Sequence, residues 1–591
     1  MALHSIVRKE DGLGGGPSPR RHRRPDLTSH RGARELATLA CWALAAATLV
    51  PLVEVVYQSF RKQTGLLSSV FSLDSYRQLF TAQIFHSAGL SLEFGLGSAV
   101  IAVVVGGALA WLLVRTDIPW RGFFEIATLV PFFLSPFILA ITWQYTGSPN
   151  TGLFNRALIA LGVAHSAVLN IYSTFGIILV IGMAHVPLAY LMISGALRQA
   201  DPSLEQAARV SGAGPLRTGL QVTARLASPG IVSAFIVSFV LGFEDLGVPL
   251  VLGVPSGIMP LSVRIWQTIQ QTFPANYNFA AAASVFMVLI PLIAFWLQRR
   301  VVGRRSRHTV GGKSSAPQRV ALGGGRWPAF ALCLLWTLFA VVLPLVTLVL
   351  TAFQRRWTGS VNLGILTFGN FTAVFHNSSS ALPVFPALTN SLLLSACTAT
   401  FVMACAVAVT YGVNRLRARG GRVADLILSM PLAVPGTTIA VGLLSLLIRT
   451  PLYATVWIIG LAYAIRYFPY ALRPVDAALT AVHPELEEAA RVAGRGLVQT
   501  VRLVILPLLR PALISGWLIL FVMFMREVAI SNLLYEGGNS TLSVALRSLS
   551  SLEPDGVVAA FTLIQIVLFL LIAGLALLAG GSRRAVLRLP T

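Results

Sequence analysis

The 591-residue sequence is poor in charge: only 11% of its residues are charged, with 22 Asp and Glu in all, whereas 55% are hydrophobic. Soluble globular chains carry about 25% charged residues. So few charges over such a length exclude an ordinary water-soluble protein. We therefore expect lipid to be the solvent for most of the chain.

Cysteine is also scarce. The four cysteines lie in apolar stretches, form no CxxC pair and have no cluster of His or carboxylates nearby; they are Cys41, Cys333, Cys397 and Cys405. We interpret them as small buried hydrophobic residues. The sequence therefore predicts no metal site, no cofactor and no catalytic constellation, and we do not expect an enzyme.

A nucleotide-binding loop is lacking too. Gly311-Gly312-Lys313-Ser314 resembles the end of a phosphate-binding loop, but Arg307 stands where that loop needs a glycine, and no strand precedes it. No other such motif occurs in the sequence. Any ATPase that works with this chain must then be a separate subunit.

What the sequence has in abundance is long apolar runs. A helix that crosses a bilayer needs about 20 mostly apolar residues. We predict an all-α polytopic membrane protein with about twelve transmembrane helices in two pseudosymmetric six-helix halves. The predicted spans are 36–57, 88–114, 122–145, 170–195, 230–252, 278–298, 328–352, 388–413, 424–447, 452–472, 512–535 and 557–580.

The distribution of Lys and Arg predicts the orientation. Most of the 45 fall in alternate connecting segments, which places those segments and both termini in the cytoplasm. Residues 1–35 are predicted to be a disordered basic tail rather than a signal peptide, and 300–327 a cytoplasmic linker between the halves 36–299 and 328–582. Because the basic residues lie between apolar spans, we expect the partner to be a lipid bilayer and not nucleic acid.

The two halves repeat each other with a shift of 282 positions. Residues 204–212, Leu-Glu-Gln-Ala-Ala-Arg-Val-Ser-Gly, match residues 486–494, Leu-Glu-Glu-Ala-Ala-Arg-Val-Ala-Gly, and the same shift places Pro187 on Pro469. Self-similarity at a fixed shift is typical of transporters built from structural repeats.

Each copy is a polar interruption between two spans on the predicted cytoplasmic side. Asp201 and Pro202 suit the start of a short helix, and Gly212 and Gly494 suit a helix end that needs a positive φ. A short helix with an alanine face can dock into a groove on a partner. An ordinary amphipathic loop would explain one copy, but two matched copies indicate a partner with two equivalent sockets.

These residues resemble the cytoplasmic coupling loop of binding-protein-dependent, type I ABC importer permeases. The second copy has the full pattern: Glu488-Ala489-Ala490, Gly494, Leu506-Pro507 and Pro511. The first copy departs from it at Gln206 and at Ala224-Arg225, so we expect unequal engagement of the two sockets. The resemblance covers nearly the whole chain, and residues 243–249 and 526–535 are similar to fused permeases of the ferric-iron transport group.

The resemblance implies a function. Two copies of a cytoplasmic ATP-binding subunit would grip the two short helices. An extracytoplasmic substrate-binding protein would deliver a small solute, with iron(III) favoured and thiamine, a polyamine or a phosphonate as alternatives. The chain would be a multi-pass permease of the bacterial inner membrane. Its ATPase-docking residues would be Glu205, Gln206, Ala207, Ala208, Gly212, Glu487, Glu488, Ala489, Ala490 and Gly494.

Ionisable residues inside spans are costly and are candidates for function. They are Glu244, Asp245, Arg466, Arg526 and Glu527, which we expect to line the translocation pathway. Glu244 and Arg526 occupy equivalent positions, so one hypothesis is that they face each other as a gate. The excess of carboxylates in the fifth and eleventh spans would favour a cation. The alternative is a permanent ion pair that holds the halves together.

Prolines near the starts of the third and ninth spans have two interpretations as well. Pro131, Pro136, Pro431 and Pro435 either break the helices and expose carbonyls to a cavity or produce harmless kinks.

The competing interpretation of the whole chain is a secondary transporter driven by an ion gradient. Twelve spans in two halves suit that class as well, but such carriers do not need paired coupling helices. A polytopic membrane enzyme would require a cluster of catalytic side chains, which the sequence lacks.

Overall fold

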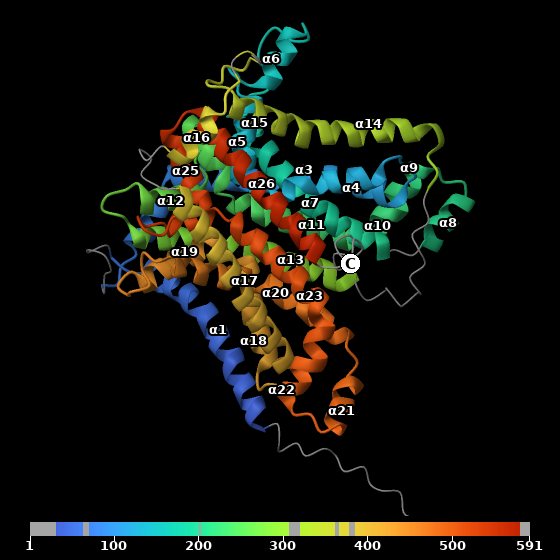
Figure 1. Ribbon diagram of the computed structural model, residues 1–591, viewed down its shortest axis with the longest axis vertical. Helices are drawn as coiled ribbons and strands as arrows, with labels where there is room; N and C mark the ends of the chain where they lie inside the picture. Colours follow the sequence, from blue (N-terminus) through green and yellow to red (C-terminus); the bar gives the residue numbers. More distant parts are fainter. Residues whose placement is uncertain are drawn as a thin grey trace, which may run out of the picture.

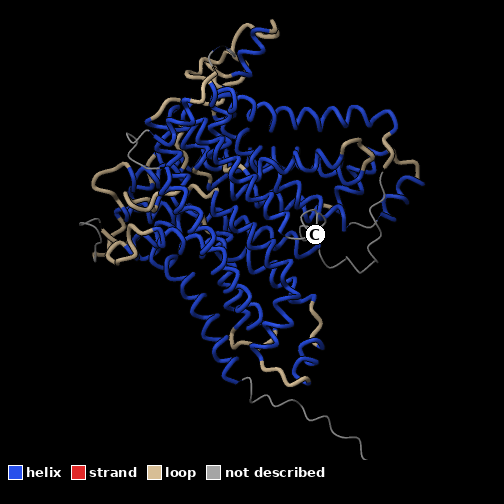
Figure 2. Tube along the Cα trace, in the orientation of Figure 1, coloured by secondary structure: helices blue, strands red, loops and turns tan. Residues whose placement is uncertain are grey.

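The structure is a computed structural model that describes residues 31–62, 70–199, 202–305, 320–360, 364, 366–376 and 384–579. Throughout these ranges the chain forms helices joined by short connections, without a β-strand (Figure 2). The all-α prediction is therefore confirmed. A polar backbone inside lipid must satisfy its own hydrogen bonds, which a helix does within one segment.

The first half is built from long helices in the order predicted. They are α1 (Arg31–Ser59), α3 (Ala82–Arg115), α4 (Arg121–Phe133), α5 (Pro136–Gly147), α7 (Thr174–Gln199), α11 (Ser228–Glu244) and α13 (Tyr277–Arg305). Shorter helices lie between them: α2 (Asp74–Leu79), α6 (Leu153–Ala160), α10 (Ala224–Leu226) and α12 (Leu261–Gln270), with the π- and 3₁₀-helical turns η2 (Pro249–Gly253) and η3 (Val254–Ser256).

The second half repeats this order. Its first long helix is made of α14 (Arg326–Thr337), η6 (Leu338–Val342) and α15 (Leu343–Phe353). The others are α17 (Val384–Asn414), α18 (Gly421–Ser429), η8 (Met430–Ala433), α19 (Gly436–Leu447), α20 (Val456–Ala481), α23 (Leu506–Met525) and α26 (Asp555–Ala579). The short helices are η5 (Gly323–Gly325), α16 (Gly369–His376), α24 (Ala529–Leu533) and α25 (Leu542–Leu552).

The exact count of twelve membrane spans is not confirmed. Eight helices in the described part of the chain are long and apolar enough to cross a membrane, and up to eleven if each bent pair counts as one span. The predicted span 452–472 corresponds to α20, which is not among them. This helix carries Arg466 in its middle, so its composition is less uniformly apolar.

The third and ninth predicted spans are broken, as one of the two proline interpretations expected. The α4–α5 pair bends by 103° and the pair formed by α18–η8 and α19 bends by 110°. Ser135 caps α5 by accepting from the Ile138 backbone N–H at 3.1 Å, and Pro136 occupies the first turn. Proline cannot continue a helix from the preceding turn, so the chain stops and restarts in a new direction.

Each half has a core of three packed helices. In the first half α3, α7 and α11 pack against one another, and in the second half α17, α20 and α23 do so. The serines at equivalent places of α3 and α17 make the same contact. Ser91 Oγ accepts from the Leu261 N–H at 2.9 Å, and Ser391 Oγ accepts from the Leu542 N–H at 2.8 Å.

The first helix of each half crosses to the other half. Helix α1 packs on α17, α18 and α19 as well as on α13, while α14–η6–α15 packs on α4, α5 and α26. At Gly442 in α19 the approach is so close that a Cβ atom would lie 2.2 Å from the Pro51 carbonyl oxygen of α1. The two halves are thus interlocked through their first helices.

The bundle has two distinct ends (Figure 1). Two short helices, α8 (Pro202–Val210) and α21 (Glu485–Val492), project at the right and at the lower right of the view, on the side away from α6 and α16. Helices α6 and α16 lie at the opposite end (Figure 1). We refer to these as the α8/α21 end and the α6/α16 end.

Candidate functional site

The matched segments of the sequence become matched structures. Helix α8 is followed by α9 (Pro215–Thr218) and a π-helical turn η1 (Gly219–Thr223), and α21 by α22 (Leu497–Thr500) and η9 (Val501–Ile505). The shift of 282 relates both turns residue by residue. Pro202 begins α8 as predicted, whereas Asp201 lies outside the described residues.

The two helices end in the same way. Gly212 has a φ of +86° and Gly494 a φ of +77°, the left-handed conformation that glycine adopts without steric cost. The N–H of Ala213 bonds to the Ala208 carbonyl, and the N–H of Arg495 bonds to the Ala490 carbonyl. The prediction of glycine C-caps is therefore confirmed at both positions.

The outer faces of α8 and α21 are exposed. Gln206, Ala207, Glu488 and Ala489 are exposed, as predicted for a docking surface, whereas Ala208 is half-buried and Ala490 is buried. Sequence reasoning missed four large apolar side chains on the same helices. Leu204, Val210, Leu486 and Val492 are all exposed, with Val210 and Val492 at 90% each. Together with the exposed alanines, these side chains give each short helix a partly apolar outer face.

The glutamates Glu205 and Glu487 face the opposite way, which corrects the prediction that they belong to the docking face. Both are 3% exposed and lie against the bundle. Glu205 pairs with Arg115 at 3.4 Å and accepts from the Thr223 hydroxyl at 3.0 Å. A buried carboxylate needs such partners, so these two residues anchor the short helices from behind.

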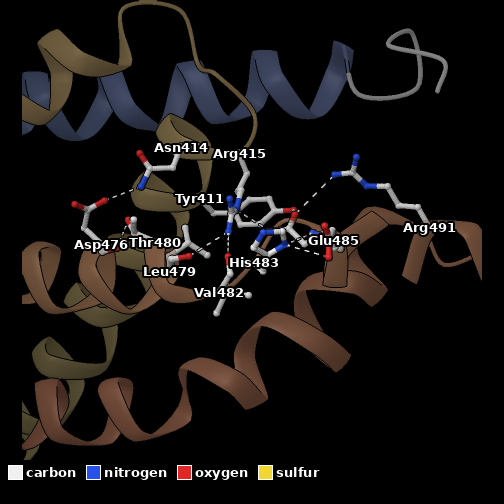
Figure 3. Close-up of polar contacts among 11 residues, drawn as sticks. Tyr411, Asn414, Arg415, Asp476, Leu479, Thr480, Val482, His483, Glu485 and Arg491 are labelled. Carbon is white, nitrogen blue, oxygen red and sulfur yellow. Dashed lines mark hydrogen bonds and ion pairs between the residues drawn. The ribbon is translucent and has the colours of Figure 1, made fainter. Parts of the chain in front are cut away.

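The second anchor is seen at close range in Figure 3. Arg415 lies between α17 and the end of α20, with its guanidinium directed at the Leu479 and Val482 carbonyls. Glu487 pairs with Arg415 at 2.8 Å, accepts from the Tyr411 hydroxyl at 3.0 Å and lies 3.8 Å from the Arg491 guanidinium.

Arg115 and Arg415 were not among the predicted site residues. In the sequence they counted only as positive charges on the cytoplasmic side. The sequence did contain a signal that these two arginines are equivalent, because each arginine lies at the end of the second span of its half. The comparison of the halves did not reveal this equivalence, because the second spans are related by a shift of 300 residues and the comparison used the shift of 282.

The ionisable residues inside the spans gather at the contact between the halves, but not in the predicted pairs. Glu244, at the end of α11, forms its ion pair with Arg466 of α20, not with Arg526. The Glu244 and Arg466 side chains are 11% and 7% exposed. The predicted Glu244–Arg526 gate is therefore wrong in its partner, because the crossing of the helices brings α20 and not α23 beside Glu244.

Both arginines donate hydrogen bonds to carbonyls at the breaks between helices. Arg466 donates to the carbonyls of Pro431 and Val434, where α18–η8 turns into α19. Arg526 donates to the Phe132 carbonyl near the break between α4 and α5, and its guanidinium lies 5.0 Å from the Phe132 ring centre. The carbonyls freed by proline are thus satisfied by side chains from elsewhere in the fold.

Asp245 and Glu527 act as helix caps. Asp245 accepts from the Val248 N–H at 2.9 Å, and Glu527 accepts from the Ile530 N–H at 2.8 Å and the Ser531 N–H at 3.1 Å. Together with the Glu244–Arg466 pair, this engages every carboxylate of the group. These hydrogen bonds hold the carboxylates in place but leave their charge unchanged, so the predicted surplus of negative charge stays a prediction.

The described part of the chain has no group of three or more His, Cys, Asp or Glu residues that could hold a metal ion. The site consists of two projecting helices at one end, each anchored by a buried ion pair, and a polar junction where the two halves meet.

Comparison with known proteins supplies the family. The family model of the binding-protein-dependent transport system inner membrane component matches twice, at residues 99–307 and 399–580, and each match contains one projecting helix. FbpB 1 of Haemophilus influenzae is 26% identical over 442 residues, which are 73% of this chain and 67% of that protein. The ferric transport system permease protein FbpB of Actinobacillus pleuropneumoniae is 25% identical over 367 residues, 61% of this chain and 52% of that protein.

Among solved structures, a bacterial ABC transporter involved in the import of the acidic polysaccharide alginate is 20% identical, with a TM-score of 0.34 over 44% of this chain and 90% of that chain. Because the family model covers more than half of the sequence, in two copies related by the internal repeat, the chain belongs to the family of binding-protein-dependent transport system inner membrane components, as a permease with both transmembrane domains fused in one polypeptide.

Proposed function

We propose that this chain forms the translocation unit of an ATP-driven importer in which two copies of a separate ATP-binding subunit engage α8 and α21. The observation that carries the proposal is the matched pair of projecting helices, each with an exposed outer face and a buried anchor. ATP-driven closure of the two subunits would move both helices together. A substrate-binding protein would deliver the cargo at the α6/α16 end.

This proposal sets the orientation. The α8/α21 end faces the cytoplasm, with both termini on that side, because most Lys and Arg residues fall in segments that connect at this end. The tail predicted at 1–35 is shorter by this account, since α1 begins at Arg31. We keep the halves at 36–299 and 328–582. The linker predicted at 300–327 is shorter by this account, since α13 continues to Arg305 and α14 begins at Arg326.

The docking surface of this proposal consists of the exposed residues only. They are Leu204, Gln206, Ala207, Val210 and Gly212 in the first half, and Leu486, Glu488, Ala489, Val492 and Gly494 in the second. Gln206 is neutral where Glu488 carries a charge, so a basic socket on the ATP-binding subunit would hold α21 more firmly than α8.

Iron(III) is the cargo we favour, because relatives that match over most of this chain or of their own length include ferric transport permeases. Thiamine, polyamines and phosphonates are the alternatives. Glu244, Asp245, Arg466, Arg526 and Glu527 lie at the junction of the halves, which is where a pathway between them would open. In the present conformation these residues are bonded to one another and to the backbone.

The test is reconstitution with the ATP-binding subunit and the binding protein in liposomes. We expect uptake of radiolabelled iron(III) only when ATP is supplied on the side of α8 and α21. Ala489→Arg should prevent copurification of the ATP-binding subunit, because it puts a long charged side chain on the exposed face of α21. Ala157→Arg, at an exposed position on α6 at the opposite end, is the control and should not.

Two results would contradict the proposal. Uptake that follows an ion gradient without ATP would establish the competing class, a secondary transporter. Copurification of the ATP-binding subunit with Ala489→Arg at wild-type yield would mean that α21 is not the docking element. Uptake of a phosphonate or a polyamine instead of iron(III) would revise the cargo and leave the rest in place.

A further inference from the structure

An arginine marks the end of the second long helix in each half. Arg115 is the last residue of α3, and Arg415 follows directly after α17. Their side chains are 0% and 16% exposed, which is unusual for residues at the end of a membrane helix, where arginine normally reaches for water. Each must therefore be bound within the protein.

The first arginine joins three elements. Arg115 Nη2 donates to the Leu197 carbonyl, in the last turn of α7, at 2.7 Å. The same nitrogen lies 3.4 Å from Glu205 Oε1 of α8. The guanidinium thus ties α3 to α7 and to the projecting helix, and it supplies a donor to one of the carbonyls that every helix end leaves without an intrahelical partner.

The second arginine does the same in the other half. Arg415 Nη2 donates to the Leu479 carbonyl at 3.1 Å and to the Val482 carbonyl at 2.6 Å, while its Nε lies 2.8 Å from Glu487 Oε1 of α21. The Tyr411 hydroxyl, one turn back on α17, donates to the other oxygen of Glu487 at 3.0 Å. Figure 3 shows Tyr411 and Arg415 beside Leu479 and Val482 at the end of α20.

The contact between the arginine, the glutamate and the leucine carbonyl is the same in both halves, although the registers differ. Leu197 and Leu479 are related by the shift of 282, and so are Glu205 and Glu487, whereas the two arginines are 300 residues apart. The same three-way contact has therefore been kept although the connection between the elements has changed length. Arginine suits it because its planar guanidinium presents five N–H donors in a fixed fork, whereas a lysine ammonium presents three donors on a single nitrogen.

The chain itself connects α7 with α8 and α20 with α21, but it does not connect α3 or α17 with these short helices. In the first half α4, α5, α6 and α7 intervene between α3 and α8. A push on α8 reaches α7 through the backbone, while α3 receives it only through side chains. The buried arginine supplies the polar contacts of that connection, and these contacts fix the orientation of the short helix relative to the long one.

We propose that Arg115 and Arg415 are positioning residues that make each projecting helix and the two long helices behind it move as one body. This inference rests on the proposed function, and it adds that α3 and α17 receive the movement of the docked helices. Without the arginine, α8 or α21 still docks, but its movement is absorbed by slippage against α3 or α17 instead of turning the half.

The experiment compares Arg415→Gln, Glu487→Gln and the double variant in the reconstituted transporter. The readout is radiolabelled iron(III) taken up per ATP hydrolysed. We expect this ratio to fall by about tenfold in all three, a typical size for coupling between sites. The double variant is decisive because it leaves no buried charge without its partner. It should assemble like the wild type and still have the low ratio.

Arg422→Gln is the matched control, since Arg422 is an exposed arginine at the same end of the second half; it should keep the wild-type ratio. The inference is overturned if the double variant regains the wild-type ratio, because the arginine then serves stability alone. It is equally overturned if uptake and hydrolysis fall in parallel, or if neither changes.

A second measurement does not depend on the cargo. Spin labels at Val104 of α3 and Phe401 of α17, both exposed to the surroundings of the bundle, report the distance between the halves in a cysteine-free background. Trapping with ATP and vanadate should change this distance in the wild type, and the change should be at least halved in the double variant. An equal change of the distance in the wild type and in the double variant would refute the inference. A wild-type protein that imports without ATP would instead refute the proposed function.

Discussion

Replacing Arg466 by glutamine removes the group that holds α20, α11 and the break before α19 together. Its guanidinium bonds Glu244 and the Pro431 and Val434 carbonyls, and its side chain is 7% exposed. Removing one partner of a buried ion pair costs about 3–5 kcal/mol, chiefly because the other charge remains buried. Glutamine can replace one of the carbonyl contacts, so we expect a loss in this range.

Glu244→Gln should cost less, because Arg466 keeps its two carbonyl partners and the amide oxygen still accepts a hydrogen bond. Arg473→Gln is the control on the same helix. Arg473 is 52% exposed and lies 3.6 Å from Asp425, and exposed pairs of this kind contribute about 0–1 kcal/mol. Thermal unfolding of the purified transporter in detergent should therefore rank Arg466→Gln lowest, then Glu244→Gln, with Arg473→Gln close to the wild type.

The same variants separate a structural link from a gate when uptake is measured beside unfolding. A structural link predicts that uptake falls in step with the unfolding midpoint. If both Arg466→Gln and Glu244→Gln unfold at the wild-type midpoint, the ion pair does not hold these helices together and the structural link is refuted. If uptake then changed while the midpoints did not, the pair would act as a gate with a partner that differs from the one expected from sequence.

Three further predictions concern single contacts. Gly442→Ala should loosen α1, because its Cβ would lie 2.2 Å from a backbone oxygen of that helix, and limited proteolysis should then cleave α1 faster. Gly494→Ala forces alanine to a φ of +77°, at a cost of about 1–2 kcal/mol, and should reduce copurification of the ATP-binding subunit, unlike Gly496→Ala, where φ is −71°. Ser391→Ala leaves the buried Leu542 N–H without its acceptor, which should lower stability by about 1–3 kcal/mol in thermal unfolding, and wild-type stability would contradict the role assigned to this bond.

The sequence determined everything that depends on local composition and on the repeat. Apolar runs predict helices because lipid leaves the backbone no other partner, and the shift of 282 placed α8 on α21 before any contact was known. The positive φ of Gly212 and Gly494 followed from a glycine at the end of each short helix. The breaks at Pro136 and Pro435 were one of two stated possibilities, because proline acts on its own backbone.

The tertiary structure alone decided which groups meet. It turned Glu205 and Glu487 inward onto Arg115 and Arg415, since a short helix has two faces and only its packing decides which one is covered. It paired Glu244 with Arg466, since the end of α11 meets the middle of α20 where the two halves pack together. A charge inside lipid must find an opposite charge or a carbonyl, but the sequence does not say which one lies within reach; that depends on how helices far apart in the chain pack.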